Sequence, residues 1–405
     1  MKLTHRLLLP SLVALPLMAS AGASSQPLAW QTTWMAAPQA TWDEHFPLPL
    51  GMPLTLDAGT LRQVVRTSLG GSQLRVVVSN EYGTAPLKLG RLTVSLESGG
   101  AAQPLHFAGR DGVTLPPGER LVSDALALAT QAGDRLRLDL QLPQPTPLAG
   151  FHWDAREKAW LLPAGQAFDS RAFITELQVE AARAPDTVVA IGDSITDGNG
   201  ATPRRDERWP DHLARRLAPQ GVAVLNAGIS GNRLLTSGMG DSGLARFERD
   251  VLRHPGVRAA IVLLGTNDIG WPRGPFGPAE PLPAVQAMAQ GLEQLARQAH
   301  RRGVRLVVGT VPPFEDALKG TPLEGHYTPE KEVLRQALNR WIRESTAFDA
   351  VVDFDAVLRD PARPTRLRAE LDSGDHLHPG DAGYRVMAEA IDLQALLGKA
   401  EKVQP

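Results

Sequence analysis

The sequence predicts an α/β domain with a doubly wound parallel sheet, preceded by an all-β domain of the sandwich or jelly-roll type. Short β-prone runs separated by turn residues fill residues 30–180, and no long helical pattern interrupts them. After residue 185, apolar runs alternate with amphipathic segments, which is the pattern of βαβ units. The stretch 181–185 reads Ala-Ala-Arg-Ala-Pro and lies where the pattern changes. We therefore expect one domain over 24–184 and a second over 185–400.

The predicted strands of the first domain are half-exposed. Residues 135–142 alternate strictly between leucine and polar residues, as in an antiparallel strand with one face on the core. Residues 61–67, 74–79 and 87–96 are further β-prone runs, and turn signals such as Gly70-Gly71 separate them. Short strands at this spacing are typical of a sandwich or jelly roll.

The second domain reads as five βα units. The predicted strands are the apolar runs 188–191, 222–226, 259–264, 304–310 and 350–354. The predicted helices cover 209–217 and 283–302, a segment that starts with Thr328 and Pro329, and a last segment from Asp381 to about 396. The helix after Thr328 is expected to bury Val333, Ala337 and Trp341. Because strands and helices alternate, we expect a parallel, flavodoxin-like sheet with helices on both faces.

The composition excludes several classes of function. The 405 residues carry a net charge of −2, which gives no electrostatic footprint for nucleic acid. The chain contains no cysteine, so disulfides, thiolate catalysis and cysteine zinc sites are excluded. The ten histidines form no His-x-x-x-His pair, and we expect neither a metal nor a cofactor.

Residues 1–23 have the features of a secretory signal peptide. Lys2 and Arg6 precede an apolar core over 7–18, which is too short to span a bilayer. Small residues at 19–23 provide two cleavage sites of the small-x-small type. No other run is long enough for a membrane span, so we expect a periplasmic or secreted protein without stable membrane insertion.

Distinctive polar residues follow the predicted strands of the second domain. Ser194 follows the first strand, and Asp375 and His378 precede the last helix. Because ligands bind at the carboxyl edge of such a sheet, we expect these groups to meet there. A serine hydroxyl needs an adjacent base, which His378 can supply, and Asp375 can hold the imidazole in one tautomer. This is the chemistry of acyl transfer from an ester to water.

The remaining strand ends supply donors for the negative charge that develops on the carbonyl oxygen. The Ser194 amide, the Gly231 amide and the Asn267 side chain are the expected oxyanion donors. Gly228 is the alternative glycine in the same loop and is interpreted as structural. Asp268 is interpreted as a cap or loop anchor.

Other residues compete for these roles. His376 is the alternative base, and Asp372 and Asp381 are alternative partners for the imidazole. Asp193 and Asp197 flank the serine and are interpreted as turn residues. Three residues near the predicted loops, for which core packing or surface pairing is an equal alternative, are candidates for substrate binding: Trp209, Arg233 and Trp271.

Four sequence blocks, in this order, resemble the SGNH/GDSL hydrolase superfamily. They are Gly-Asp-Ser-Ile at 192–195, Gly-Ile-Ser-Gly at 228–231, Gly-Thr-Asn-Asp at 265–268 and Asp-x-x-His-Pro at 375–379. The resemblance covers about residues 186–397 and implies a flavodoxin-like fold and ester hydrolysis without a metal. It assigns the nucleophile to Ser194, the base to His378, its partner to Asp375, and the oxyanion donors to Ser194, Gly231 and Asn267. The first domain resembles, more loosely, the β-rich domain of secreted two-domain carbohydrate esterases.

We therefore expect a secreted serine esterase that removes small acyl groups, in the first place acetyl, from a small-molecule or polysaccharide ester. Three alternatives stay open. They are a lipolytic or aryl esterase of broad specificity, an O-acetyltransferase with the same residues, and an inactive glycan-binding protein.

Overall fold

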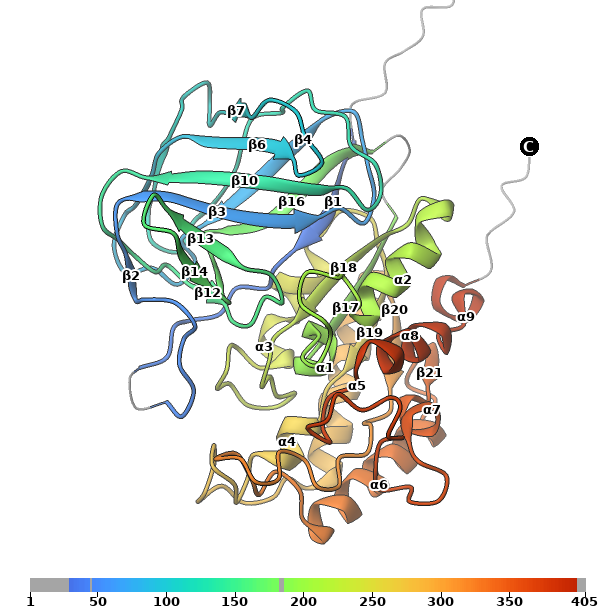
Figure 1. The fold of residues 1–405 in the computed structure, drawn as a ribbon. Helices are drawn as coiled ribbons and strands as arrows, with labels where there is room; N and C mark the ends of the chain where they lie inside the picture. Colours follow the sequence, from blue (N-terminus) through green and yellow to red (C-terminus); the bar gives the residue numbers. More distant parts are fainter. Residues whose placement is uncertain (1–28, 44–45, 182–185, 399–405) are drawn as a thin grey trace, which may run out of the picture.

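The computed structural model describes residues 29–43, 46–181 and 186–398. The chain forms an all-β half and an α/β half that lie against each other (Figure 1). The predicted signal segment, 1–23, lies outside the described residues, and so do 182–185 of the predicted boundary. The last antiparallel strand ends at Ala181 and the first parallel strand begins at Thr187.

Two antiparallel sheets form the first domain, in the strand orders β1-β16-β4-β9 and β14-β13-β3-β10-β6-β7. Their strands are β1 (Ala29–Met35), β3 (Gly59–Arg66), β4 (Leu74–Ser79), β6 (Leu92–Leu96), β7 (Gln103–Leu105), β9 (Arg120–Val122), β10 (Arg135–Leu142), β13 (Ala159–Leu162), β14 (Gln166–Phe168) and β16 (Ile174–Ala181). Three short pairs complete the domain: β2 (Thr55–Leu56) with β11 (Thr146–Pro147), β5 (Leu87–Leu89) with β8 (Val113–Leu115), and β12 (Phe151–His152) with β15 (Arg171–Ala172). Side chains from both sheets share one apolar core, as in a sandwich.

The alternation in β10 determines how the strand packs. Its four leucines are buried and its polar residues between them are more exposed, as the period of two predicts. The predicted strand 87–96 is instead two strands, β5 and β6, because the pairing is irregular between them: the Gly90 N–H donates to the Gln141 carbonyl and the Gln141 N–H donates to the Arg91 carbonyl, each at 2.8 Å. The two strands then pair with different partners, β8 and β10.

The second domain is built on a parallel sheet in the order β18-β17-β19-β20-β21, which is the flavodoxin-like order 2-1-3-4-5. The strands are β17 (Thr187–Gly192), β18 (Ala223–Gly228), β19 (Val257–Leu263), β20 (Arg305–Gly309) and β21 (Ala350–Val352). The helices are α1 (Ser194–Asp197), α2 (Trp209–Leu217), α3 (Gly243–Phe247), α4 (Thr266–Gly270), α5 (Val285–Arg301), α6 (Pro329–Glu344), α7 (Phe354–Leu358), α8 (Asp381–Glu389) and α9 (Leu393–Leu397). A 3₁₀ turn, η1 (Ala218–Gln220), follows α2, and a π-helical turn, η2 (Glu248–Leu252), follows α3. In the described residues, none of the helices has the length and apolarity needed to cross a bilayer.

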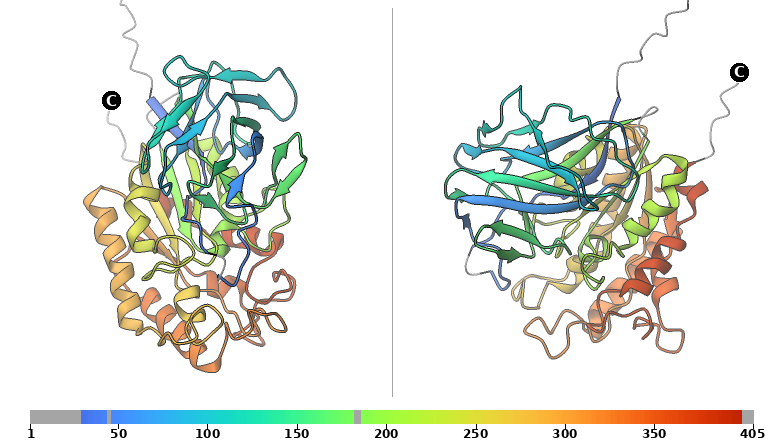
Figure 2. Two further views of the ribbon diagram at one scale, coloured as in Figure 1. Left: turned by 90° about the vertical axis from the view of Figure 1, so that its left-hand side faces the viewer. Right: turned by 45° about the horizontal axis from the view of Figure 1, so that its top comes forward.

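Helices cover both faces of this sheet (Figures 1 and 2). Along β17, Val188 and Ala190 face α2 and α8, whereas Val189 and Ile191 face α5 and α6. Burial on both faces explains why the strand reads as a continuous apolar run.

Helix α6 begins as the sequence predicts but buries a different face. Thr328 caps it by accepting the Lys331 N–H at 3.3 Å. Val333, expected to be buried, is 68% exposed. The buried face instead carries Arg335, which bonds Glu332 at 2.6 Å and Asp355 at 2.7 Å. The inner face therefore combines apolar residues, Leu338 and Ile342, with charged residues that neutralise one another.

The predicted C-terminal helix is two helices, α8 and α9. Gly380, not Asp381, is the N-cap of α8. The Asp381 carboxylate instead accepts from the Thr202 N–H at 2.7 Å and the Thr202 hydroxyl at 2.6 Å. It therefore ties the start of α8 to the loop after α1.

The two domains share an extensive boundary. Met35 and Ala37, in and just after β1, belong to the apolar core on one face of the parallel sheet. Polar contacts also cross the boundary: Tyr82 donates to Asp241 at 2.6 Å, and Arg135 donates to Asp206 at 2.9 Å. The β domain is therefore packed onto the second domain through apolar and ionic contacts.

Candidate active site

Ser194 stands at the end of β17, where the buried strand gives way to α1. Asp193 is the N-cap of this helix and accepts the Ile195 N–H at 3.0 Å. A side chain at Gly192 would place its Cβ 2.0 Å from the Thr196 hydroxyl, so only glycine fits before this turn. The turn therefore holds Ser194 at the carboxyl edge of the sheet, 7% exposed.

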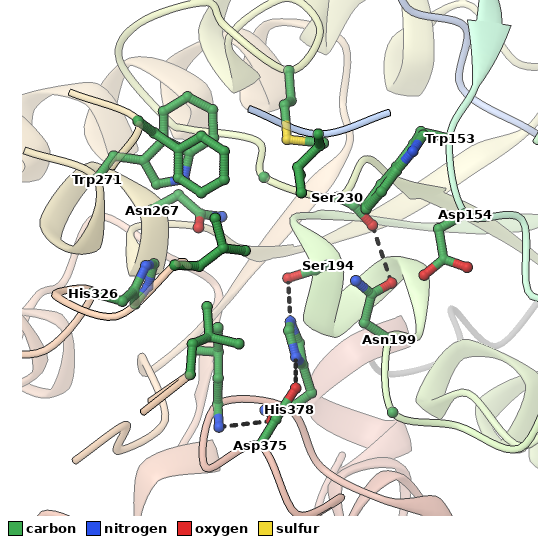
Figure 3. A pocket seen from close by; sticks show the side chains of 18 of the residues that line it. Trp153, Asp154, Ser194, Asn199, Ser230, Asn267, Trp271, His326, Asp375 and His378 are labelled. Carbon is green, nitrogen blue, oxygen red and sulfur yellow. Dashed lines mark hydrogen bonds and ion pairs between the residues drawn. The ribbon is translucent and has the colours of Figure 1, made fainter. Parts of the chain in front are cut away.

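Asp375 and His378 meet Ser194 there, as Figure 3 shows. His378 Nε2 lies 2.8 Å from the Ser194 hydroxyl, and His378 Nδ1 lies 2.6 Å from Asp375 Oδ2. The other carboxylate oxygen of Asp375 accepts the backbone N–H groups of Leu377 at 2.9 Å and His378 at 2.8 Å. Since a carboxylate only accepts, Nδ1 carries a proton and Nε2 is the basic nitrogen that faces the hydroxyl.

Hydrogen bonding determines the charge state of Asp375. Burial alone would raise the pKa of this carboxyl, but the hydrogen bonds and the charge of His378 outweigh that effect. They hold the pKa of Asp375 well below its ordinary range, so the group is a carboxylate at neutral pH.

The alternative base and its alternative partners lie elsewhere. His376 Nδ1 contacts Asp372 Oδ2 at 2.6 Å, and its side chain is 45% exposed. Asp372 also accepts the N–H groups of Gly374 at 2.8 Å and His376 at 3.1 Å, so it anchors the turn. Asp381 holds Thr202, as described above. The structure thus joins His378 and not His376 to the serine.

The three expected oxyanion donors line one pocket with the serine hydroxyl. Gly231 has φ +73°, and a Cβ there would lie 2.3 Å from the sulfur of Met239. The Asn267 amide donates one hydrogen to the Asn232 carbonyl at 3.0 Å, which fixes its orientation. In the described residues, no hydrogen bond is found from the Ser194 N–H or the Gly231 N–H. Both amides therefore remain available to an oxygen in the pocket.

Two neighbouring residues have the structural roles that the sequence suggests. A Cβ at Gly228 would lie 2.3 Å from the Asp197 nitrogen, so this glycine permits close packing of β18 against α1. The Asp268 carboxylate accepts the N–H groups of Leu234 at 2.7 Å and Leu235 at 3.0 Å, and so anchors that loop.

A buried chain of hydrogen bonds links the first domain to the Gly231 loop. His152 Nδ1 donates to the Ala37 carbonyl at 3.0 Å, and His152 Nε2 lies 3.0 Å from Asp197 Oδ1. Asp197 Oδ2 accepts the Ser230 N–H at 3.1 Å and the Ser230 hydroxyl at 2.9 Å. The residue before Gly231 is thus held by a carboxylate that a histidine of the β domain supports. Asp197 is more than a turn residue.

The pocket has a volume of about 300 Å³ and draws its walls from both domains. Sequence reasoning missed most of the lining. The missed residues are Leu48, Trp153, Asp154 and Arg156 of the first domain, and Asn199, Gly200, Ser230, Met239, Phe276, Leu318, Leu323, His326 and Leu377 of the second. The run Phe-His-Trp-Asp at 151–154 was the available signal, since aromatic and charged residues together in a predicted loop are typical of binding surfaces.

One side of the pocket is apolar. Trp271 stacks on Phe276 with ring centroids 4.6 Å apart, and Phe276 contacts Phe46 of the first domain at 5.8 Å. Arg233 does not line the pocket; its guanidinium lies 4.8 Å from the Trp271 ring centroid and bonds Glu280 at 2.6 Å. Of the two candidates, Trp271 faces the pocket and Arg233 supports it from behind.

The prediction that Trp209 binds substrate is wrong. Its side chain is 0% exposed and lies in the core between α2 and α7, with its ring centroid 5.9 Å from Phe354. Apolar packing of α2 against the sheet accounts for the residue.

Two further titratable groups have shifted pKa values: His326, which lines the pocket, and the fully buried Asp193, which precedes Ser194. Burial raises the pKa of Asp193 to about 7, although the Ile195 N–H and the charge of His378 act in the opposite direction. Burial and the nearby Lys331 lower the pKa of His326 to about 3, so that imidazole is neutral at physiological pH. No group of three or more His, Cys, Asp or Glu in the described part of the chain is arranged to hold a metal.

Comparison with known proteins identifies the second domain. The model of the GDSL-like Lipase/Acylhydrolase family matches residues 190–386. Among solved structures, a carbohydrate acetylesterase family member from Sinorhizobium meliloti is 19% identical, with 53% of this chain and 99% of that chain covered and a TM-score of 0.40. A GDSL-like lipase from Bacteroides thetaiotaomicron is 17% identical, with 51% and 85% covered and a TM-score of 0.37. No curated protein matches the chain.

The matched range begins within β17 and ends within α8, so it contains the serine, the imidazole, the carboxylate and the proposed oxyanion donors. The second domain is therefore a GDSL-like lipase/acylhydrolase domain, and this assignment indicates hydrolysis of ester bonds.

Proposed function

We propose that the protein is a serine esterase that removes short acyl groups, in the first place acetyl, from carbohydrate esters through an acyl-enzyme. One observation carries the proposal: the Ser194 hydroxyl lies 2.8 Å from His378 Nε2. A nucleophile within hydrogen-bond reach of an oriented base is the arrangement that acyl transfer requires.

The reaction follows from this geometry. His378 Nε2 takes the Ser194 proton as the serine oxygen bonds to the ester carbonyl carbon, and the carbonyl electron pair moves to its oxygen. The Ser194 and Gly231 amides and the Asn267 side chain stabilise that oxyanion. The alcohol then leaves with the proton from His378, and water repeats the sequence on the acyl-enzyme. Asp375 stabilises the imidazolium that forms in each half-reaction.

The apolar side of the pocket, which contains Trp271, favours a short acyl group over a long one. Met239 and Trp271 lie against Gly231, so the space beside this oxyanion donor is narrow. His326 also lines the pocket and packs against Gly270, where a Cβ would lie 2.1 Å from its Nε2. An acetyl methyl fits such a space, and a long chain would need these side chains to move.

Direct assays test the proposal. Two rates are measured: hydrolysis of p-nitrophenyl esters from acetate to octanoate, and acetate release from acetylated xylan. Both are measured for wild type, for Ser194→Ala and for the distant control Ser345→Ala. We expect the highest kcat/KM on acetate, acetate release from xylan, and loss of both activities in Ser194→Ala alone. Wild-type rates in Ser194→Ala would refute the proposed nucleophile.

Other results would select the alternatives. A preference for octanoate indicates a lipolytic esterase, and acetate that appears on an added glycan acceptor indicates an acetyltransferase. If wild type hydrolyses nothing and is not labelled by a fluorophosphonate, the protein is an inactive glycan-binding protein.

We also propose that the protein is exported to the periplasm or beyond, supported by the signal-like segment 1–23. N-terminal sequencing of the mature protein should begin after Ala21 or Ala23. An N-terminus at Met1 in a soluble cytosolic fraction would contradict export.

A further inference from the structure

The loop 153–156 brings the β domain into the pocket. Trp153, Asp154 and Arg156 line the pocket, and Figure 3 shows Trp153 and Asp154 beside Asn199 and Ser230, on the side away from Trp271. Asp154 has φ +47° and Arg156 has φ +54°, a backbone conformation that non-glycine residues rarely adopt. Strain of this kind persists where the surrounding structure enforces a particular side-chain direction.

Asp154 is a carboxylate with an incomplete set of hydrogen bonds. In the described residues, its only partner is Arg156, whose Nη1 lies 3.5 Å from both carboxylate oxygens. That distance is longer than an ordinary hydrogen bond. The side chain is 20% exposed, and burial raises the pKa of Asp154 despite the nearby guanidinium. A half-buried acceptor at a pocket is stabilised by a ligand that donates hydrogen bonds to it.

The Trp153 N–H is bonded within the first domain and is not free to bind a ligand. Its Nε1 donates to the Pro49 carbonyl at 2.8 Å, and Trp42 contacts the ring edge-on with centroids 6.0 Å apart. The indole is therefore fixed, and it contributes apolar ring carbons to the lining of the pocket. Such a surface suits the C–H face of a sugar ring.

Asn199 adds a donor on the same side. Its side-chain oxygen shares the Ser230 hydroxyl hydrogen with Asp197, at 3.1 Å and 2.9 Å, and in the described residues its Nδ2 group has no hydrogen-bond partner. In Figure 3 this nitrogen points toward Ser194. The polar side of the pocket thus combines a carboxylate acceptor, an amide donor and an aromatic face close to the reacting serine.

We propose that Trp153 and Asp154, from the β domain, form the subsite for the leaving alcohol, and that this alcohol is a neutral, polyhydroxylated ring. The inference rests on the proposed function and specifies which residues recognise the alcohol. The guanidinium of Arg156 beside Asp154 disfavours a cationic alcohol such as choline. A long apolar alcohol would cover the carboxylate without donating a hydrogen bond to it, which costs free energy.

The test compares esters that share one acyl group. The kcat/KM values for acetylated xylooligosaccharide, ethyl acetate and acetylcholine are measured for wild type, Trp153→Ala and Asp154→Gly. Glycine tolerates φ +47°, so the second variant removes the carboxylate without adding backbone strain. We expect the ratio of kcat/KM for the sugar ester to that for ethyl acetate to fall about tenfold or more in each variant.

Matched controls come from the same domain. Trp160, 38% exposed on β13, and Asp169, exposed and paired with Lys158 at 2.6 Å, do not line the pocket. Trp160→Ala and Asp169→Asn should keep the wild-type ratio. Circular dichroism and the urea midpoint verify that each variant is folded.

Each outcome is decisive for the subsite. If the ratio of kcat/KM for the sugar ester to that for ethyl acetate is unchanged in folded Trp153→Ala and Asp154→Gly, the proposed subsite is wrong and the proposed ester hydrolysis stands. The same conclusion follows if wild type prefers acetylcholine over the sugar ester. If wild type hydrolyses no ester, or if Ser194→Ala hydrolyses them all, the proposed function fails and the subsite with it.

Discussion

Removing the His152 imidazole should slow catalysis from the far side of a domain boundary. His152→Leu keeps the apolar volume but deletes the donor to the Ala37 carbonyl and the contact with Asp197 Oδ1, each 3.0 Å long. The oxygen of Asp197 that faced the imidazole then lies buried without a partner. The other oxygen still accepts from Ser230, which precedes the Gly231 amide.

The expected magnitudes follow from these contacts. A neutral hydrogen bond contributes about 1 kcal/mol and one to a charged group about 1.5–3 kcal/mol, so the free energy of unfolding should fall by about 2–4 kcal/mol. Loss of one oxyanion donor lowers kcat about 10²–10³-fold, and this is the largest decrease expected if the Gly231 amide is displaced. Because Ser230 keeps its bonds to Asp197, we expect a decrease in kcat of about tenfold, with little change in KM.

The assay compares kcat, KM and the urea midpoint of wild type, His152→Leu, His152→Gln and the control Gln63→Leu. In His152→Gln the introduced amide can still donate to Asp197, so this variant should recover part of kcat. Gln63 is equally buried in the same domain and donates to the Ala172 carbonyl at 2.9 Å, so its loss should cost stability alone. A folded His152→Leu enzyme with kcat within about twofold of wild type would refute the reasoning.

Three further predictions concern the site itself. Asp375→Asn should lower kcat about 10²–10⁴-fold without unfolding the protein, because the imidazole loses its orienting carboxylate; a decrease of less than about tenfold would contradict this role. Met239→Ala should raise the kcat/KM ratio of octanoate to acetate about tenfold by opening the wall beside Gly231, and an unchanged ratio would place the acyl group elsewhere. The pKa of Asp193 is about 7 in the folded protein and near 4 in the unfolded chain. The protonated carboxyl therefore contributes fully to the free energy of unfolding below about pH 4, and this contribution is lost as the pH rises to about 7. Asp193→Asn should therefore be more stable relative to wild type at pH 8 than at pH 5 in urea titrations, and an equal difference at both pH values would contradict the shift.

Much of the fold follows from local sequence. The leucine alternation predicts the bounds of β10, and the apolar run 188–191 predicts the central strand β17. Thr328 and Pro329 mark the start of α6 because capping depends only on neighbouring backbone groups. The four motif blocks also indicate which groups meet at the edge of the sheet, since strand order and parallel pairing bring their loops together.

The failures arise where distant residues decide the outcome. The inner face of α6 can include Arg335 because Asp355, twenty positions further along, supplies the compensating carboxylate, and no helical period reveals that. Trp209 stands at the start of a predicted helix, beside a predicted loop, but lies in the core because α2 packs against α8 and Trp209 itself packs on Phe354 of α7. Trp153 reaches the pocket, and His152 reaches Asp197, only through the docking of one domain on the other, which has no local signature.

The pocket therefore has two separately encoded parts. The groups placed to break the ester bond come from the chain after β17 begins, whereas Trp153 and Asp154 come from the half before it. Mutations in the earlier half can change which alcohol is accepted while the bond-breaking groups stay intact. Such a division lets descendants of one enzyme diversify their substrates by altering a single loop, and the same loop is where an engineer seeking a new specificity should begin.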